Sequence, residues 1–305
     1  MDIARQILKE KKRLNATLVA HYYQEPAIQE LADFVGDSLA LAQYCEKNNQ
    51  KIIVFCGVKF MAETAKILNP HKKVLLPDLD AGCSLADSCQ PAPFQYFKSK
   101  LNNPYVAMYI NSNVEIKALS DVIVTSSNAE KIIRSIPKDR TVLFGPDRHL
   151  GNYLIKKTGR EMVLWQGVCI VHETFNLKKL LELKLDYPEA QVIAHPECEE
   201  NILAHADFIG STSKLLQFTK EDQHSTYIVL TESGIIHQMK KASPQKIFVE
   251  GPNQSGCSCN ECPYMRLNTL EKLLACMKNE TPEIIIEESL RRQAYLPLKK
   301  MLELS

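Results

Sequence analysis

The chain has 305 residues and a mass of 34.6 kDa, a length that fits about two ordinary domains or three small ones. A hydrophobic fraction of 45% and a charged fraction of 24% are typical of globular proteins and exclude a disordered chain, a collagen and a coiled coil. The formal net charge of +1 gives no support to non-specific binding of nucleic acid or of an anionic membrane surface.

The N-terminal segment, MDIARQILKEKKRLN, is predicted to form an amphipathic helix. It lacks the uninterrupted apolar region of a signal peptide, and no apolar run in the chain approaches the ~18 residues of a membrane span. We therefore expect a cytoplasmic protein. In a reducing compartment, the ten cysteines are expected to bind metal or take part in chemistry rather than form a disulfide scaffold.

Short apolar strands and helices alternate after this helix. Strands are predicted at residues 17–23, 33–36, 51–56 and 73–76, and helices at 26–32, 38–47 and 59–68. Pro26 suits the first turn of a helix, and Ser38 is placed to cap the next one. Alternation of this kind predicts a parallel sheet with helices on both faces.

The same pattern occurs three times, in segments that begin at Leu18, Tyr105 and Val192. Three sets of residues recur at intervals of 86 to 88 residues: His21, Met108 and His195; Asp33, Asp121 and Asp207; and Ser38, Ser126 and Thr212. A cysteine after a short apolar run closes each repeat. Chance similarity between α/β segments is the alternative, but several features in one order at one period argue against it.

The predicted fold class is α/β, with three homologous three-layer α/β/α domains that have small parallel sheets and surround a pseudo-threefold axis. We expect the domains at residues 1–95, 96–182 and 183–266, and a helical tail at 267–305 that packs back on the body. Small units bury little surface alone, so they should pack on one another. The polar residues that follow the strands would then share the carboxyl ends of parallel strands, where open α/β sheets bind ligands.

One cysteine in each repeat, Cys83, Cys169 or Cys262, could lie near the axis. Thiolates suit zinc, copper(I) and iron–sulfur clusters. Three of them on a four-iron cluster would leave one iron open as a Lewis acid. The alternative is that each is a small buried hydrophobic residue.

Cys257 and Cys259 share a CxCxxC motif with Cys262 and could form a local metal knuckle or a redox-active pair. Among the others, we expect Cys45, Cys56 and Cys276 in the core and leave Cys89 and Cys198 unassigned.

Each repeat also has a hydroxyl-bearing pair where a helix is expected to begin: Asp37-Ser38, Ser126-Ser127 and Ser211-Thr212. These pairs are expected to cap helices. If the three helix termini face one pocket, their free N–H groups could also bind anions.

Two histidines in register, His21 and His195, are candidates for binding carboxylates or for acid–base chemistry. The same loops contain Tyr23, Tyr109, Asn111 and Glu197. Glu197 could be a general base or a solvated loop carboxylate. Arg148 could pair with a phosphate or be an ordinary surface arginine.

Seven segments in this order resemble those of one known family: VAHYYQ, GVKFMAETAKILNP, DAGCSLADSC, FGPDRHLG, HPEC, TESGIIH and CPYMRLN. The chain is similar to the quinolinate synthase family from about residue 16 to about residue 280. The resemblance implies a transferase of NAD biosynthesis that condenses iminoaspartate with dihydroxyacetone phosphate and releases quinolinate, phosphate and two waters. It also implies three α/β/α domains and a 4Fe-4S cluster with three cysteine ligands and one open iron.

Matched to the motifs of this chain, the resemblance implies that Cys83, Cys169 and Cys262 are the cluster ligands. Tyr23, His21, His195 and Glu197 are the implied catalytic residues. The implied substrate-binding residues are His21, Ser38, Tyr109, Asn111, Ser126, His195, Glu197 and Thr212. The expected partners are the two small substrates, without nucleic acid or membrane, and we also expect functional coupling to an aspartate-oxidising enzyme.

One feature departs from the family pattern. Some members have CxxCxxC where this chain has CxCxxC, so a regulatory disulfide between the first two cysteines is doubtful here. Two other classes of function stay open: a different iron–sulfur hydro-lyase with an open iron, and a cluster-bearing sensor without enzymatic activity. A sensor would not need His21, His195 and Glu197 in register around a pocket.

Overall fold

The computed structural model describes residues 2–254 and 260–305, and it contains three sheets of four parallel strands. The strand orders are β2-β1-β3-β4, β6-β5-β7-β8 and β10-β9-β11-β12. The strands are β1 (Ala16–His21), β2 (Phe34–Gly36), β3 (Ile52–Cys56), β4 (Lys73–Leu75), β5 (Tyr105–Tyr109), β6 (Val122–Val124), β7 (Val142–Gly145), β8 (Met162–Leu164), β9 (Gln191–Ala194), β10 (Phe208–Ile209), β11 (Thr226–Leu230) and β12 (Ile247–Glu250). One topology is therefore used three times, and the predicted fold class is confirmed.

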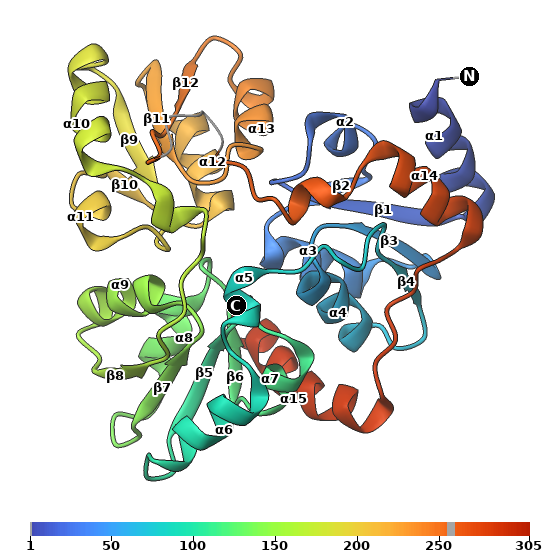
Figure 1. The fold of residues 1–305 in the computed structure, drawn as a ribbon, viewed down its shortest axis with the longest axis horizontal. Coiled ribbons are helices and arrows are strands. Elements are labelled where there is room, and N and C mark those ends of the chain that lie inside the picture. Colours follow the sequence, from blue (N-terminus) through green and yellow to red (C-terminus); the bar gives the residue numbers. More distant parts are fainter. Residues whose placement is uncertain (1, 255–259) are drawn as a thin grey trace.

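Helices flank each sheet, and the three units form three lobes around a common centre (Figure 1). The helices between strands are α2 (Pro26–Gln29), α3 (Ser38–Lys47), α4 (Lys59–Leu68), α7 (Val114–Ala118), α8 (Ala129–Ser135), α9 (Arg148–Thr158), α11 (Glu200–Leu203), α12 (Thr212–Glu221) and α13 (Ile235–Ala242). The first and second units are joined by α5 (Ser84–Asp87) and α6 (Pro91–Ser99), and the second and third by η1 (His172–Thr174) and α10 (Leu177–Asp186).

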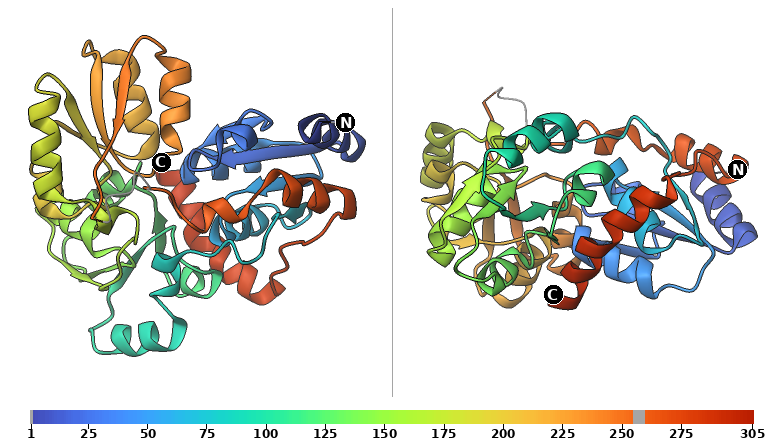
Figure 2. Two further views of the ribbon diagram at one scale, coloured as in Figure 1. Left: turned by 45° about the horizontal axis from the view of Figure 1, so that its top comes forward. Right: turned by 90° about the horizontal axis from the view of Figure 1, so that it is seen from below.

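The terminal helices pack across the first unit. The C-terminal segment contains η2 (Met265–Leu267), α14 (Leu270–Asn279) and α15 (Glu288–Leu304). α14 packs against the N-terminal helix α1 (Ile3–Leu14), and α15 lies against α4 and α7, so it bridges the first two units (Figure 2). Its residues Ala294, Leu298 and Met301 are fully buried in a core that both units share. Across the described residues, no helix combines the length and apolarity that a membrane crossing requires.

An aspartate fixes the same local geometry in all three units. It stands just before the second strand of its unit and makes two hydrogen bonds with one residue of the first strand. Its side-chain Oδ2 accepts from the backbone N–H of that residue, and its own backbone N–H donates to the carbonyl of that residue. The pairs are Asp33–Leu18 at 2.8 Å, Asp121–Val106 at 2.7 Å and Asp207–Val192 at 2.8 Å. These hydrogen bonds align the three repeats residue by residue.

The alignment corrects one expectation from the sequence. His21, Tyr109 and His195 each lie three residues after the strand residue that bonds the aspartate. Tyr109 is therefore the counterpart of the two histidines. The expectation that Met108 fills this place is wrong by one residue. Successive side chains of a strand point to opposite faces, and Met108 is fully buried in the core.

Candidate active site

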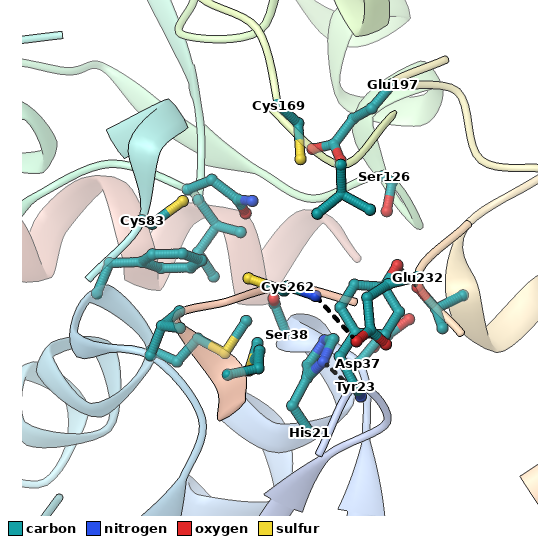
Figure 3. A pocket seen from close by; sticks show the side chains of 18 of the residues that line it. His21, Tyr23, Asp37, Ser38, Cys83, Ser126, Cys169, Glu197, Glu232 and Cys262 are labelled. Atoms are coloured by element: carbon teal, nitrogen blue, oxygen red, sulfur yellow. Dashed lines mark hydrogen bonds between the residues drawn. The ribbon is translucent and has the colours of Figure 1, made fainter. Parts of the chain in front are cut away.

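One pocket lies where the three units meet, and residues that follow the parallel strands line it (Figure 3). Its empty volume is about 660 Å³, including the open space at its mouth. All twelve residues proposed from the sequence line it: His21, Tyr23, Ser38, Cys83, Tyr109, Asn111, Ser126, Cys169, His195, Glu197, Thr212 and Cys262.

These residues come from four positions of the repeat, each used three times. The first position holds His21, Tyr109 and His195. The second position, two residues later, holds Tyr23, Asn111 and Glu197. The third holds Ser38, Ser126 and Thr212, and the fourth holds Cys83, Cys169 and Cys262. The second position therefore presents a different functional group from each unit, whereas the third always presents a hydroxyl and the fourth always a thiol.

The two histidines are held in the same way. Nδ1 of His21 accepts a hydrogen bond from the backbone N–H of Tyr23 at 3.2 Å, and Nδ1 of His195 accepts one from Glu197 at 3.4 Å. A backbone amide can only donate, so the ring proton of neutral His21 is placed on Nε2. In His195, Nδ1 also lies 3.4 Å from Oε2 of Glu197, and Nε2 lies 3.2 Å from Oγ of Ser126. Burial lowers the pKa of His21 to about 4. His21 is therefore neutral at pH 7 and offers one N–H donor.

Glu197 is a buried carboxylate paired with His172. Its Oε2 lies 2.8 Å from Nδ1 of His172, and its Oε1 has no hydrogen-bond partner among the described residues. Burial acts to raise the pKa of Glu197, but His172 and His195 outweigh it and lower that pKa. The rings of these histidines stack at 4.8 Å between centroids. Glu197 is therefore held ionised, with one oxygen free to accept a proton.

A chain of hydrogen bonds joins Glu197 to Tyr23. Nε2 of His172 lies 2.9 Å from Oγ1 of Thr231, and that oxygen lies 2.8 Å from the Tyr23 hydroxyl. The Tyr23 hydroxyl also lies 3.0 Å from Oγ1 of Thr212. Burial raises the pKa of Tyr23 well above its usual value near 10, so the phenol is protonated. The chain can move a proton between a phenol and a carboxylate from different units.

The hydroxyls of Ser38, Ser126 and Thr212 face the pocket but do not cap helices. Ser38 is the first residue of α3, whose cap is Asp37, and Thr212 is the first residue of α12, whose cap is Ser211. In the second unit, α8 begins at Ala129, and its N-cap residue makes no side-chain capping bond. The expectation that each hydroxyl pair caps a helix is therefore wrong in the second unit, and in the first unit the cap is Asp37 instead of Ser38.

Ser127 has a different role from the expected cap. Its hydroxyl oxygen lies 2.9 Å from Oδ2 of Asp37 and 2.7 Å from Oγ of Ser211. It thus joins the helix caps of the first and third units to the second. These contacts fix the relative positions of the three loops that present the pocket hydroxyls.

Comparison with known proteins agrees with this geometry. The family model described as "Quinolinate synthetase A protein" matches residues 5–303. A quinolinate synthase of Chloroherpeton thalassium is 58% identical over all of this chain and 95% of its own length. Those of Microcystis aeruginosa and Synechocystis sp. are 57% and 59% identical over all of this chain and 95% and 96% of their lengths. The chain belongs to the quinolinate synthase family.

In this member of the quinolinate synthase family, the three pocket cysteines share one local arrangement. Each stands directly before or close to a short helical turn, and the backbone N–H three residues later, at Ala86, His172 or Met265, acts to lower the pKa of the thiol. Figure 3 shows the sulfurs of Cys83, Cys169 and Cys262 pointing toward a common space. N–H groups directed at sulfur are typical of thiolates that ligate a cluster.

The thiols of these three cysteines are neutral at pH 7 when no metal is bound. Burial raises the pKa of Cys83 to about 12 and of Cys262 to about 11, and raises that of Cys169 well above its usual value. Three neighbouring thiols that are neutral by themselves become thiolates when a metal displaces their protons. Cys169, His172 and Glu197 also place their ligand atoms within 4.8 Å of one another and could hold a metal ion.

The other cysteines that the structure describes do not line the pocket. Cys45, Cys56 and Cys276 are buried in the core, as expected, and Cys89 and Cys198 are fully buried as well. Cys257 and Cys259 lie outside the described residues. Arg148 does not line the pocket: it pairs with Glu173 at 3.0 Å, and both side chains are 37% exposed. The structure thus gives Arg148 a surface ion pair.

Four polar residues of the site were missed in the sequence: Thr125, which directly follows β6, His172, Thr231 and Glu232. Thr231 and Glu232 directly follow β11, so the rule that selects residues after strands could have found them. His172 stands in a linker, at a repeat position occupied by Ala86 and Met265 in the other units. Comparison between the repeats therefore gave no signal for it.

Proposed function

We propose that this protein condenses iminoaspartate with dihydroxyacetone phosphate and releases quinolinate, phosphate and two waters, as a step of NAD biosynthesis. The observation that carries the proposal is the convergence of all twelve expected residues on one pocket. Membership of the quinolinate synthase family supports the same reaction.

Neutral hydrogen-bond donors are proposed to bind the anionic groups of the substrates. The two substrates carry two carboxylates and one phosphate, yet no lysine or arginine occurs among the described residues that line the pocket. The Nε2–H group of His21, the His195 ring and the hydroxyls of Ser38, Ser126 and Thr212 are proposed as the donors. Nε2 of His195 lies 3.2 Å from Oγ of Ser126, so these two groups are proposed to act as a pair. Tyr109 and Asn111 line the same wall, and Oδ1 of Asn111 is buried without a hydrogen-bond partner, so it can accept from a substrate N–H or O–H.

Proton transfers are proposed for Glu197 and Tyr23. Loss of phosphate and two waters requires protons to be removed from carbon or nitrogen and delivered to leaving oxygens. The free oxygen of Glu197 is placed to accept a proton, and the Tyr23 hydroxyl is placed to donate one. The path through His172 and Thr231 would return the proton from carboxylate to phenol, so that both groups are reset after each transfer.

Cys83, Cys169 and Cys262 are proposed to hold a 4Fe-4S cluster. Their backbone N–H contacts and their shared position in the repeat fit such a group. With three protein ligands, the cluster would supply an open iron as Lewis acid when bound. We also propose functional coupling to an aspartate-oxidising enzyme, since oxidation of aspartate to its imine yields iminoaspartate.

Anaerobic purification, iron and sulfide analysis and an assay for quinolinate by liquid chromatography with mass spectrometry test this proposal. We expect about four irons and four sulfides per chain and formation of quinolinate only when both substrates are present. Reactions without dihydroxyacetone phosphate, and reactions with hydroxy acids that iron–sulfur hydro-lyases dehydrate, are the controls. Turnover of a hydroxy acid without formation of quinolinate would assign a different hydro-lyase activity, and a cluster without any turnover would indicate a sensor.

A further inference from the structure

Glu232 is a fully buried carboxylate of the pocket that has no place in the proposed chemistry. It follows β11 and accepts hydrogen bonds from three donors. Its Oε1 accepts from the backbone N–H of Cys262 at 3.2 Å and from Nη2 of Arg266 at 3.1 Å, and its Oε2 accepts from the backbone N–H of Gly234 at 2.7 Å. Figure 3 shows the bond between Cys262 and Glu232 at the edge of the pocket.

Arg266 extends this contact to the first unit. It lies four residues after Cys262, and its backbone N–H donates to the Cys262 carbonyl at 3.2 Å. Its Nη1 donates to the backbone carbonyl of Tyr23 at 2.8 Å. The guanidinium therefore touches the loop that presents the phenol, while its other end pairs with the carboxylate that touches the third cysteine.

The segment that contains Cys262 needs such an anchor. Residues 260–264 form neither helix nor strand, so hydrogen bonds to other segments of the chain fix their position. The segment is tied to the third unit where the carbonyl of Asn260 accepts from the N–H of Ser233 at 3.2 Å. Glu232, which precedes Ser233 in the chain, adds a side-chain acceptor at the backbone N–H of Cys262 itself.

We propose that Glu232 and Arg266 form a clamp that positions the Cys262 thiol and the Tyr23 loop relative to each other. Both are positioning residues, since neither is assigned to the substrate or to the metal. The role of the clamp in cluster retention rests on the proposed function. Its effect on the position of Cys262 does not, because the hydrogen bonds join only groups of the chain itself.

Removal of one member alone would leave the other as an unpaired buried charge and could destabilise the whole fold. The decisive variant is therefore the double substitution Glu232→Leu with Arg266→Met, which replaces both charged groups with apolar groups of similar size. Glu261→Gln is the matched control, because Glu261 lies 3.2 Å from Nε of Arg266 but is half-exposed and does not line the pocket.

The full-length chain without its cluster is treated with iodoacetamide, and alkylation of Cys83, Cys169 and Cys262 is followed separately by peptide mass spectrometry. We expect the double variant to melt near the wild-type temperature while Cys262 alone is alkylated about tenfold faster, the size of effect for loss of one charge-assisted hydrogen bond. After cluster reconstitution, it should lose iron to a chelator about tenfold faster than the wild type and the Glu261→Gln control.

The clamp would be overturned if all three cysteines of the double variant were alkylated at their wild-type rates and the variant retained iron as the wild type does. A lower melting temperature with faster alkylation of all three cysteines would also overturn it, since that result indicates general destabilisation. A quinolinate assay of the wild type separates the two proposals. An inactive wild type with selective exposure of Cys262 in the variant rejects the proposed function and supports the clamp. If the wild type forms quinolinate and the double variant shows no change in Cys262 alkylation, the proposed function is supported and the clamp is rejected.

Discussion

Tyr23 and Glu197 occupy the same position of two different repeats, each two residues after an aligned histidine. One is a phenol whose pKa is raised by burial, and the other is a carboxylate whose pKa is lowered by two histidines. They are joined through Thr231 and His172 by hydrogen bonds of 2.8 to 2.9 Å. Repetition of one fold has thus placed a phenol and a carboxylate in one pocket.

The hydroxyl of Thr231 is the middle link of this path, which leads to the first prediction. Thr231→Val should keep the cluster and the fold but lower kcat by about a hundredfold, the lower range for loss of a positioned proton transfer. Thr231→Ser keeps the hydroxyl and should retain most of the activity. Equal kcat values for Thr231→Val and Thr231→Ser, at equal iron content, would show that protons do not pass through this residue.

The proposed cluster ligands give the second prediction. Cys83→Ser, Cys169→Ser and Cys262→Ser should each abolish a stable cluster, because each removes one of the three proposed protein ligands. Cys257→Ser and Cys259→Ser should retain it. Iron and sulfide per chain are measured after anaerobic reconstitution. If Cys262→Ser keeps full iron and activity while Cys259→Ser loses both, the ligand of the C-terminal motif has been assigned to the wrong cysteine.

The third prediction separates the histidines from the metal. His21→Ala and His195→Ala should keep near wild-type iron and lose about 10²–10⁴-fold in turnover, as expected for groups that bind substrate or move protons. Iron analysis and steady-state rates are measured on the same preparations. Loss of iron in either variant would place that histidine among the metal ligands instead.

The buried state of His21 also makes stability depend on pH. Its pKa is about 4 in the folded chain and about 6.5 when unfolded, so the unfolded state binds more protons between these values. Stability from this group is therefore present above pH 6.5 and is lost as pH falls toward 4. Between pH 7 and pH 5 the loss should be about 2 kcal/mol.

Urea unfolding of the cluster-free chain at the two pH values tests this dependence. His21→Gln should remove about 2 kcal/mol of the difference between pH 7 and pH 5. His71→Gln is the control, because His71 is exposed. An identical pH dependence in the wild type and in His21→Gln would show that His21 does not contribute to it.

The repeat, the fold class and the twelve pocket-lining residues could be predicted from the sequence because they follow a rule of topology: residues after parallel strands gather at one end of a sheet. The register of the second unit could not. β5 has few exposed residues on either face, so no alternation of polar and apolar residues fixes its register. Asp121 does so through a hydrogen bond to Val106, which places Tyr109, and not Met108, in the pocket.

The helix caps were misassigned for a related reason. When two neighbouring residues both have a hydroxyl or carboxyl group, either one can cap a helix. Which of them does so depends on where the first helical turn begins. In the first unit Asp37 takes the cap and leaves Ser38 free. In the second unit, Oδ1 of Asn128 accepts from the N–H of Thr125 in a turn that delays α8 to Ala129. Local propensity cannot distinguish these outcomes.

The freed hydroxyls lead to the last prediction. Ser38, Ser126 and Thr212 occupy one repeat position and line the pocket, but none is an N-cap. Alanine at each should therefore cost less stability than the ~1 kcal/mol typical of a lost cap. A hydrogen bond to a charged group contributes roughly 1.5–3 kcal/mol. Affinity for a dicarboxylate analogue should fall about ten- to a hundredfold where the lost hydroxyl contacts a carboxylate.

The three variants should not behave alike, because the substrates present two carboxylates and one phosphate to three equivalent hydroxyls. The variant that loses the phosphate contact should bind the dicarboxylate analogue normally and require more dihydroxyacetone phosphate for half-maximal rate. Calorimetric titration with the analogue and the steady-state dependence on dihydroxyacetone phosphate measure the two effects. Thr212→Ser keeps the hydroxyl and serves as control, although Thr212 also bonds Tyr23. Wild-type values for all three alanine variants would show that these hydroxyls do not bind substrate, and the anions would then have to be held by His21, His195 and backbone N–H groups alone.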